Sequence, residues 1–356
     1  MLIGDNAGSA QMVMAAQPAL QRTVVLHIGM HKTASTYIQK RLRKNRALLK
    51  ANGLLMPKRR DLDTALLHAA DQGHWKPWRQ WLERAESRGC DTLISHEAFS
   101  QTLRKPASRG SQARGLWLAE RLRKRGWRLK LICFVRDQES YLNSRYTQLV
   151  KRLSIRSDFP PYVDKVMKGN TISECDLITL FGWLRQQPDI DVVMVPFGST
   201  RDQHGRRLET RPDPFHQLVA ALALPPAVIT RCKPARSLNQ QPGRLGVSLA
   251  LAVSRFLAEH HPEALKLHAK QLRGAIERMA KANDWPSEPF NGLNIAIRER
   301  IRHRYQASNA EFCRTFWRDI QINILFLSDP SNRITQGNTV APVIGNVRTC
   351  AVQSSA

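Results

Sequence analysis

A short apolar stretch that runs directly into a turn and a polar helix start constrains the fold of this chain most. The stretch is TVVLHIGMHKTASTY, from Thr23 to Tyr37. Its β-branched first half predicts a buried strand, Gly29 interrupts that strand, and a helical pattern opens in the second half. A strand followed at once by a turn and a helix is typical of an α/β unit with parallel strands.

The polar half of this stretch has the composition of a phosphate-binding loop. Lys32 supplies a full positive charge, and Thr33, Ser35 and Thr36 supply hydroxyl donors that need no deprotonation. The unpaired N–H groups of a first helical turn and the positive end of the helix dipole also favour an anion. We therefore expect a phosphate or sulfate group to bind here.

The spacing disfavours an ordinary ATP or GTP loop. A Walker A loop places four residues between its first Gly and a second Gly that directly precedes the Lys. Here Gly29 lies only three residues before Lys32, and His31 occupies the position before the lysine. His27 and His31 are four residues apart, but on a strand and a turn, so we expect no metal site from them.

The rest of the chain alternates predicted helices and strands, which indicates a central parallel sheet flanked by helices. Strands are predicted in 90–97, 127–137 and 189–198, with a short extended piece at 53–57. Helices are predicted at 34–51, 61–89, 114–126, 140–153 and 172–187, with a proline-rich loop at 158–161. After a polar loop at 198–214 the pattern is mostly helical, at 215–223, 244–260, 263–282 and 293–318.

The domain organisation that we predict is one α/β domain over residues 22–328. Residues 1–21 have no basic residue and only a short, interrupted apolar stretch, so we expect a flexible extension rather than a secretory signal. Residues 329–356 have few charges and weak periodicity, and we expect a poorly ordered tail. No run of about 18 apolar residues exists, so no transmembrane segment is expected.

Cysteine content and charge narrow the setting and the partners. The six cysteines are scattered without zinc-binding spacing, which favours a reduced, cytoplasmic protein with no metal. The formal net charge of +26 attracts anions such as nucleic acid, anionic lipid, a nucleotide or an acidic polymer. Most individual Lys and Arg residues are nevertheless expected on solvated helix faces.

A second group of polar residues lies at and after the end of the predicted strand 127–137, which has the strongest strand pattern in the chain. Arg136 comes at the carboxyl end of that strand, where open α/β sheets bind their ligands. Ser144 follows eight residues later, about two helical turns into the next helix. A guanidinium and a hydroxyl so placed can both reach one phosphate.

With these two motifs the chain resembles the sulfotransferase family that uses 3′-phosphoadenosine 5′-phosphosulfate (PAPS), and its bacterial members in particular. The resemblance covers roughly residues 22–200 and implies a P-loop-like sulfotransferase architecture. It implies that PAPS is the donor, bound without a metal. The first motif, around the 5′-phosphosulfate, is filled by His31, Lys32, Thr33, Ala34, Ser35 and Thr36.

The resemblance also implies roles for single residues. Lys32 is expected to bind the phosphosulfate and support the leaving phosphate, and Arg136 with Ser144 to bind the 3′-phosphate. Ala34 departs from the family pattern, which more often has Gly at that position, so a loop that needs positive φ there would be strained. Asn239 stands where related proteins often have an Asn-containing loop near the nucleotide, although a turn-forming Asn explains it as well.

A base is needed for the acceptor, and SHEAF (95–99) follows the second predicted strand. Many bacterial members of this family have a Ser-Glu pair in the corresponding segment. The resemblance therefore makes Glu97 the first candidate for general base. His96 is the second, because an ordinary histidine pKa suits proton abstraction near neutral pH. Alternatively, Glu97 caps the next helix.

The expected activity is transfer of a sulfuryl group from PAPS to a hydroxyl or amine of an acceptor. The basic surface suits an anionic glycan or glycolipid. One alternative is a P-loop-related nucleotide or small-molecule kinase. Such a kinase needs a Walker A glycine directly before the lysine, and this sequence does not have it. Another is a basic nucleic-acid-binding protein, for which we find no specific sequence signature. A catalytically inactive member of the same fold is a third.

Overall fold

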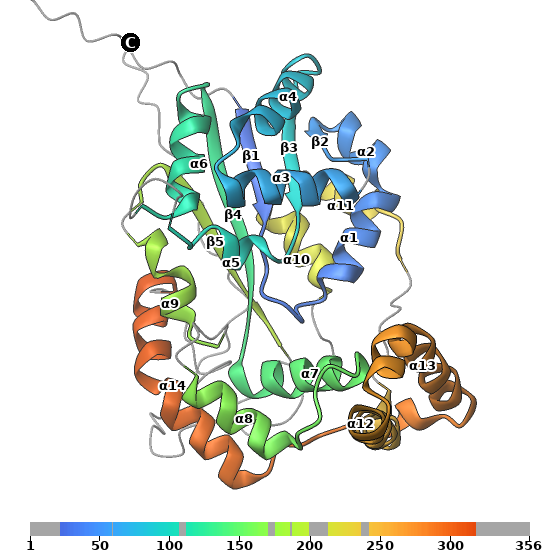
Figure 1. Ribbon diagram of the computed structural model, residues 1–356. Coiled ribbons are helices and arrows are strands. Elements are labelled where there is room, and N and C mark those ends of the chain that lie inside the picture. The colour runs from blue at the N-terminus through green and yellow to red at the C-terminus, as the bar shows by residue number, and fades with distance from the viewer. Residues whose placement is uncertain are drawn as a thin grey trace, which may run out of the picture.

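Parallel strands in the order β2-β3-β1-β4-β5 form the sheet of the computed structural model (Figure 1). They are β1 (Arg22–His27), β2 (Leu54–Leu55), β3 (Asp91–Ser95), β4 (Trp127–Arg136) and β5 (Ile190–Phe197). The structure describes residues 22–58, 60–106, 112–169, 175–185, 187–198, 213–235 and 242–317. The predicted extension 1–21, the predicted tail 329–356 and Asn239 lie outside these ranges.

Helices on both faces cover the sheet. The first half of the chain contributes α1 (Ser35–Lys44), α2 (Arg46–Ala51), α3 (Arg60–Gln72), α4 (Trp75–Glu86), α5 (Phe99–Thr102), α6 (Arg114–Arg123) and α7 (Gln138–Lys151). The second half contributes α8 (Phe159–Lys168), α9 (Leu177–Phe181), α10 (Pro214–Ala221), α11 (Pro226–Arg231), α12 (Gly243–His260), α13 (Pro262–Ala282) and α14 (Ile295–Phe316). Two 3₁₀ turns are η1 (Gly182–Leu184) and η2 (Trp285–Ser287).

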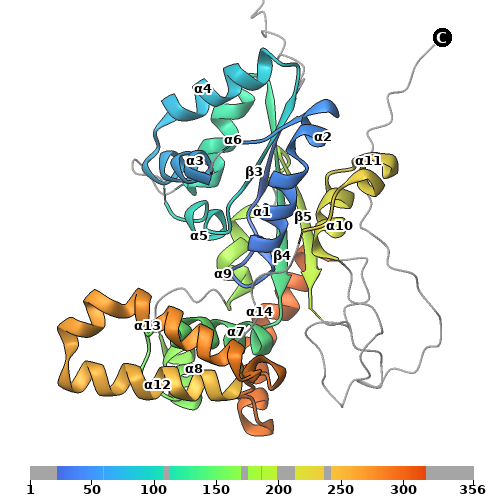
Figure 2. The ribbon, with the colours of Figure 1, turned by 90° about the vertical axis from the view of Figure 1, so that its right-hand side faces the viewer.

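Alternating side chains of β1 divide the core into two layers. Val24 and Leu26 are fully buried in the cluster that contains residues of α3, α4 and α6. Val25 packs in the other cluster, with residues of α1 and α10. Figure 2 shows α3, α4 and α6 on one side of the sheet and α10 and α11 on the other. This is the arrangement expected for a parallel sheet, whose strands are buried on both faces.

Helices from the second half of the chain gather beyond the carboxyl ends of the strands. In Figures 1 and 2, α7, α8, α12 and α13 lie at this end, and α14 runs beside α8 and α9. A reciprocal amide pair joins α7 to α14, because Gln138 and Asn309 each donate to the other, at 2.6 and 3.1 Å. Glu139 accepts from both Arg298 and Arg302 of α14. These contacts hold α7 and α14 together beyond the carboxyl ends of the strands.

The structure confirms the α/β class, the parallel sheet and the mostly helical C-terminal part. The proline-rich loop predicted at 158–161 is wrong, because Pro160 and Pro161 lie in the first turn of α8. Proline is tolerated there, since first-turn N–H groups have no intrahelical partner. The helices predicted at 34–51 and 61–89 are each two helices, and α11 is a helix that the pattern did not predict.

The helix predicted at 172–187 lies partly outside the described residues. Over 172–187 the structure describes only the short α9 and η1. None of the described helices is long and apolar enough to cross a membrane.

Candidate active site

The loop between β1 and α1 is held by backbone hydrogen bonds to β4. Beyond the end of β1 the pairing continues, because Ile28 N–H donates to the Ile132 carbonyl at 2.9 Å and Met30 N–H to the Phe134 carbonyl at 3.2 Å. The fully buried Thr33 hydroxyl then donates to the Met30 carbonyl at 2.7 Å and closes the turn. The loop is thereby fixed at the carboxyl end of the sheet.

Two residues of this loop have left-handed backbone conformations. Lys32 has φ 67° and Ala34 has φ 58°, and Ala34 is the N-cap residue of α1. Such conformations cost an L-residue with a side chain roughly 1–2 kcal/mol each. The strain expected at Ala34 is therefore present, and contacts around the loop must offset it.

Arg136 supplies one of those contacts. Its Nη1 donates to the Lys32 carbonyl at 2.6 Å, and its Nε donates to the Ser140 hydroxyl at 2.9 Å. The guanidinium also lies over the Phe197 ring, 5.6 Å from the centroid. The two sequence motifs, 104 residues apart, therefore meet through a direct hydrogen bond.

Ser140, a residue that the sequence patterns do not single out, holds Arg136 in place. Ser140 is fixed by Asp137, the N-cap residue of α7, whose carboxylate accepts from the Ser140 backbone N–H at 2.8 Å and from its hydroxyl. Ser144 lies one turn further along α7 with its side chain buried. Asp is a favoured N-cap residue, so the sequence did carry a clue to the cap at Asp137, although not to the contact between Ser140 and Arg136.

Positive charge is concentrated around Lys32. Burial lowers its pKa to about 8, with further contributions from the nearby cations Arg136, Lys151, Arg145 and Arg152. The first turn of α1 has no acidic residue, and no side chain caps it. The arrangement is therefore electrostatically unfavourable without an anion and suited to binding one. Ser35 is buried and Thr36 is half-buried in the same helical turn.

Glu97 lies beside this group at the end of β3. Gln39 of α1 donates to its carboxylate at 3.0 Å. Burial alone would raise the pKa of Glu97, but its own backbone N–H, His96, His31 and Gln39 together lower it. Burial, followed by Arg145, lowers the pKa of His31. A charged carboxylate that can accept a proton therefore lies next to a largely neutral histidine.

The structure separates the two base candidates. The Ala98 backbone N–H donates to His96 Nδ1 at 3.2 Å, so the neutral ring has its acceptor nitrogen already engaged. Glu97 does not cap the following helix: the N-cap residue of α5 is Ala98, and no side chain caps that helix. The interpretation of Glu97 as a helix cap is thus wrong.

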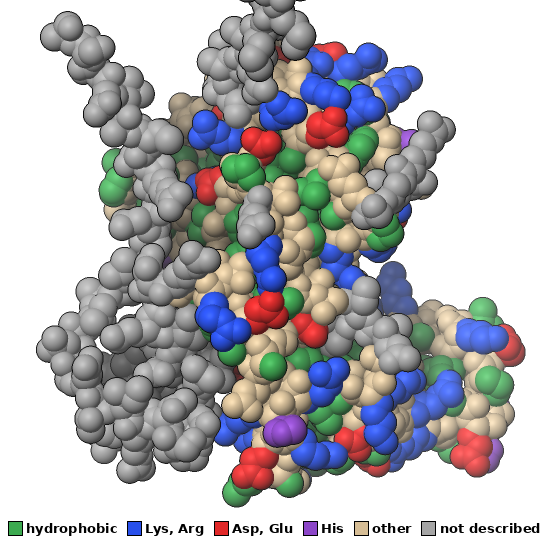
Figure 3. All heavy atoms as spheres, turned by 90° about the vertical axis from the view of Figure 1, so that its left-hand side faces the viewer, with side chains coloured by type: hydrophobic (Ala, Val, Ile, Leu, Met, Phe, Trp, Pro, Cys, Tyr) green, Lys and Arg blue, Asp and Glu red, His purple; other side chains and the backbone are tan. Residues whose placement is uncertain are grey.

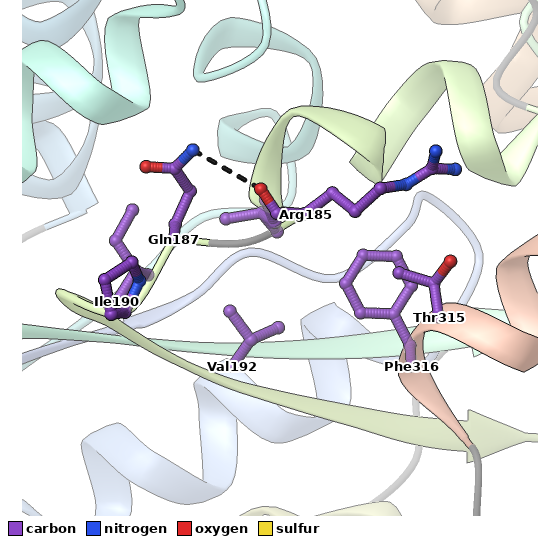
Figure 4. A pocket seen from close by; sticks show the side chains of 8 residues that line it. Arg185, Gln187, Ile190, Val192, Thr315 and Phe316 are labelled. Atoms are coloured by element: carbon purple, nitrogen blue, oxygen red, sulfur yellow. Dashed lines mark hydrogen bonds between the residues drawn. The ribbon is translucent and has the colours of Figure 1, made fainter.

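The carboxyl end of the sheet thus brings together Lys32, Thr33, His31, Glu97 and Arg136. Among the described residues, no group of three or more His, Cys, Asp or Glu side chains could hold a metal. A shallow hollow lies elsewhere, beside the start of β5, and Ile190, Val192 and Phe316 are among the residues that line it (Figure 4). It is about 20 Å along the strand from Phe197 and contains none of the predicted site residues.

The chain matches no known family model, curated protein or solved structure in the comparisons made. The site is therefore interpreted from its own geometry.

Replacing Ala34 with Gly is expected to raise the free energy of unfolding by about 0.5 kcal/mol. Relief of the left-handed strain should slightly outweigh the greater freedom of Gly in the unfolded chain and the lost methyl contact. Urea denaturation measures the change. Ala269→Gly, in the middle of α13, is the matched control and should destabilise by about 1 kcal/mol. Equal losses for both variants would contradict strain at Ala34.

The pKa of Lys32 predicts how anion binding depends on pH. An anion favours the protonated amine, so affinity should be constant well below pH 8 and fall up to tenfold per pH unit above it. Sulfate is the suitable probe because its charge is constant over this range, and NMR titration measures its affinity. Lys32→Arg should abolish the decline, whereas Lys40→Arg on α1 should retain it. A decline that persists in Lys32→Arg would assign the titration to another group.

Proposed function

We propose that this chain is a PAPS-dependent sulfotransferase of P-loop-like architecture. The observation that carries the proposal is the hydrogen bond from Arg136 to the Lys32 carbonyl, which joins the two motifs at one edge of the sheet. A nucleotide with phosphate groups at both ends of its ribose needs two cationic anchors within one ligand's reach. Lys32 and Arg136 meet that requirement.

The position of these anchors in the sheet supports the same interpretation. In the order β2-β3-β1-β4-β5, the chain leaves β1 toward β2 and leaves β4 toward β5, so the connections diverge between β1 and β4. Open α/β sheets bind ligands beyond the carboxyl ends of the strands at such a switch point. Lys32 follows β1, and Arg136 ends β4.

The chemistry follows from the residues present. The donor supplies the sulfuryl group, whose bond to the 5′-phosphate oxygen breaks as a bond to the acceptor oxygen or nitrogen forms. Lys32 and the first-turn N–H groups of α1 stabilise the charge that develops on the phosphate oxygen. Glu97 takes the proton of the acceptor. Thr33 and Arg136 hold the loop in place, and Arg136 with the nearby Ser144 binds the 3′-phosphate.

Cations of α7 and of its C-cap residue, Arg152, support a proposal for the acceptor. The pKa of Lys32 is lowered by three cations besides Arg136, namely Arg145, Lys151 and Arg152. The positive charge near Lys32 therefore exceeds that of Lys32 and Arg136, the two residues proposed to bind the donor. An anionic glycan or glycolipid is therefore the acceptor class that we propose. On the face shown in Figure 3, Lys and Arg side chains outnumber Asp and Glu side chains and lie among polar and hydrophobic ones. None of the five described cysteines forms a disulfide, consistent with the cytoplasmic setting that we propose.

Thermal shifts with adenosine 3′,5′-bisphosphate, AMP and ATP–magnesium test the nucleotide. The bisphosphate should stabilise the wild-type chain by several degrees and the other two by much less. Arg136→Ala should lose most of this shift, and Arg128→Ala, an exposed position earlier on the same strand, should retain it. Equal shifts from AMP would contradict a 3′-phosphate site. A selective shift with ATP–magnesium would instead support the kinase alternative.

Glu97→Gln tests the proton acceptor, because it keeps the shape of the side chain and removes its basicity. Transfer of a labelled sulfuryl group from PAPS to phenols and to neutral and anionic oligosaccharides should fall about 10²-fold or more. Binding of the bisphosphate should change less than threefold. His96→Asn, the matched variant next to it, should reduce transfer less than tenfold. A larger effect from His96→Asn would make His96 the base.

A further inference from the structure

His27, the last residue of β1, has one buried nitrogen whose partner the structure does not provide. The side chain is completely buried, and its Nδ1 lies 2.7 Å from the Ser95 hydroxyl on β3. Its Nε2 is also buried and makes no hydrogen bond. An unpaired buried polar atom is costly to folding and calls for an explanation.

The free nitrogen faces the phosphate-binding loop from below. A methyl group built on Gly29 would come within 3.2 Å of His27 Nε2 and within 3.0 Å of the Thr33 hydroxyl oxygen. The two polar atoms therefore border the same small space, which exists because residue 29 has no side chain. The imidazole and the Phe134 ring pack against each other in a T-shaped arrangement, with centroids 5.4 Å apart.

The tautomer follows from the neighbouring donors. Burial lowers the pKa of His27 to about 4, so the ring is neutral at physiological pH and carries one N–H. The Thr33 hydroxyl gives its proton to the Met30 carbonyl, which leaves its lone pairs toward the shared space. A proton on Nε2 faces these lone pairs favourably, whereas a lone pair on Nε2 would be repelled. The Ser95 hydroxyl then donates to Nδ1.

We propose that His27 is a positioning residue for the β1–α1 loop, with its Nε2–H directed by Ser95 toward the Thr33 hydroxyl. It acts through Thr33, whose hydroxyl closes the turn, on the left-handed backbone at Lys32 and Ala34. His27 touches neither donor nor acceptor. Its consequence for binding rests on the proposed function, whereas its consequence for loop order does not.

A matched pair of amides tests the assignment in the full-length chain. Gln can place an amide near the position of Nε2, whereas Asn can place one near Nδ1. Hydrogen exchange of the peptide 28–37 in the ligand-free protein should be at least tenfold faster in His27→Asn and close to wild type in His27→Gln. His68→Asn, at an exposed position on α3, is the control and should change nothing in this peptide. Equal acceleration by both His27 variants would overturn the proposal.

Binding and spectroscopy complete the test. Calorimetry with adenosine 3′,5′-bisphosphate should show at least tenfold weaker binding for His27→Asn and less than threefold for His27→Gln. The imidazole ¹⁵N spectrum of the wild type should show the proton on Nε2, and a proton on Nδ1 would refute the proposed direction. If His27→Asn does not fold, Gly29→Ala, which forces a methyl into the shared space, should produce the same faster exchange.

These readouts separate the two proposals. A wild-type chain that does not bind the bisphosphate but shows the expected exchange pattern would refute the donor and support the role of His27. Normal bisphosphate binding with no difference between His27→Asn and His27→Gln would support the donor and refute the role of His27.

Discussion

The hydrogen bond from Arg136 to the Lys32 carbonyl is the contact on which the candidate site depends. It fixes a strained loop to the end of the neighbouring strand. Because Arg136 is itself held by Ser140, and Ser140 by the Asp137 cap, the loop position is set by the start of α7. The loop, the strand end and the helix start therefore form one rigid unit.

This rigidity has an electrostatic consequence. Lys32 is held among other cations, and burial with their repulsion lowers its pKa to about 8. The fixed loop backbone places the Lys32 side chain in a largely buried position near these cations. The free protein thus bears an electrostatic cost that a bound anion relieves, which is how a preorganised site gains affinity.

Much of the fold could be predicted from the sequence because buried parallel strands are nearly continuous apolar runs. The runs around Trp127–Arg136 and Ile190–Phe197 are of this kind, and both are strands. The prolines of α8 misled the prediction, since the same residues break a helix interior and begin a helix. Only the three-dimensional arrangement shows which applies.

The candidate site was predictable in part. Lys32 and Arg136 stand out by their position after strands, and both lie at the carboxyl end of the sheet. The choice between Glu97 and His96 depends on the turn that aims the Ala98 N–H at an imidazole nitrogen, which no residue pattern reveals. The sequence alone indicates for His27 no role beyond that of an improbable metal ligand. The positioning role that we propose for His27 rests on its unpaired nitrogen and on the space beside Gly29.

The strand order also determines when this site can form during folding. Its parts follow β1, β3 and β4, which are neighbours in space but lie far apart along the chain. Pairing of such distant segments carries a large loop-closure entropy and is intrinsically slow. A growing chain cannot complete the candidate site before Arg136 has emerged from the ribosome, so the site belongs to the assembled domain and not to any early fragment.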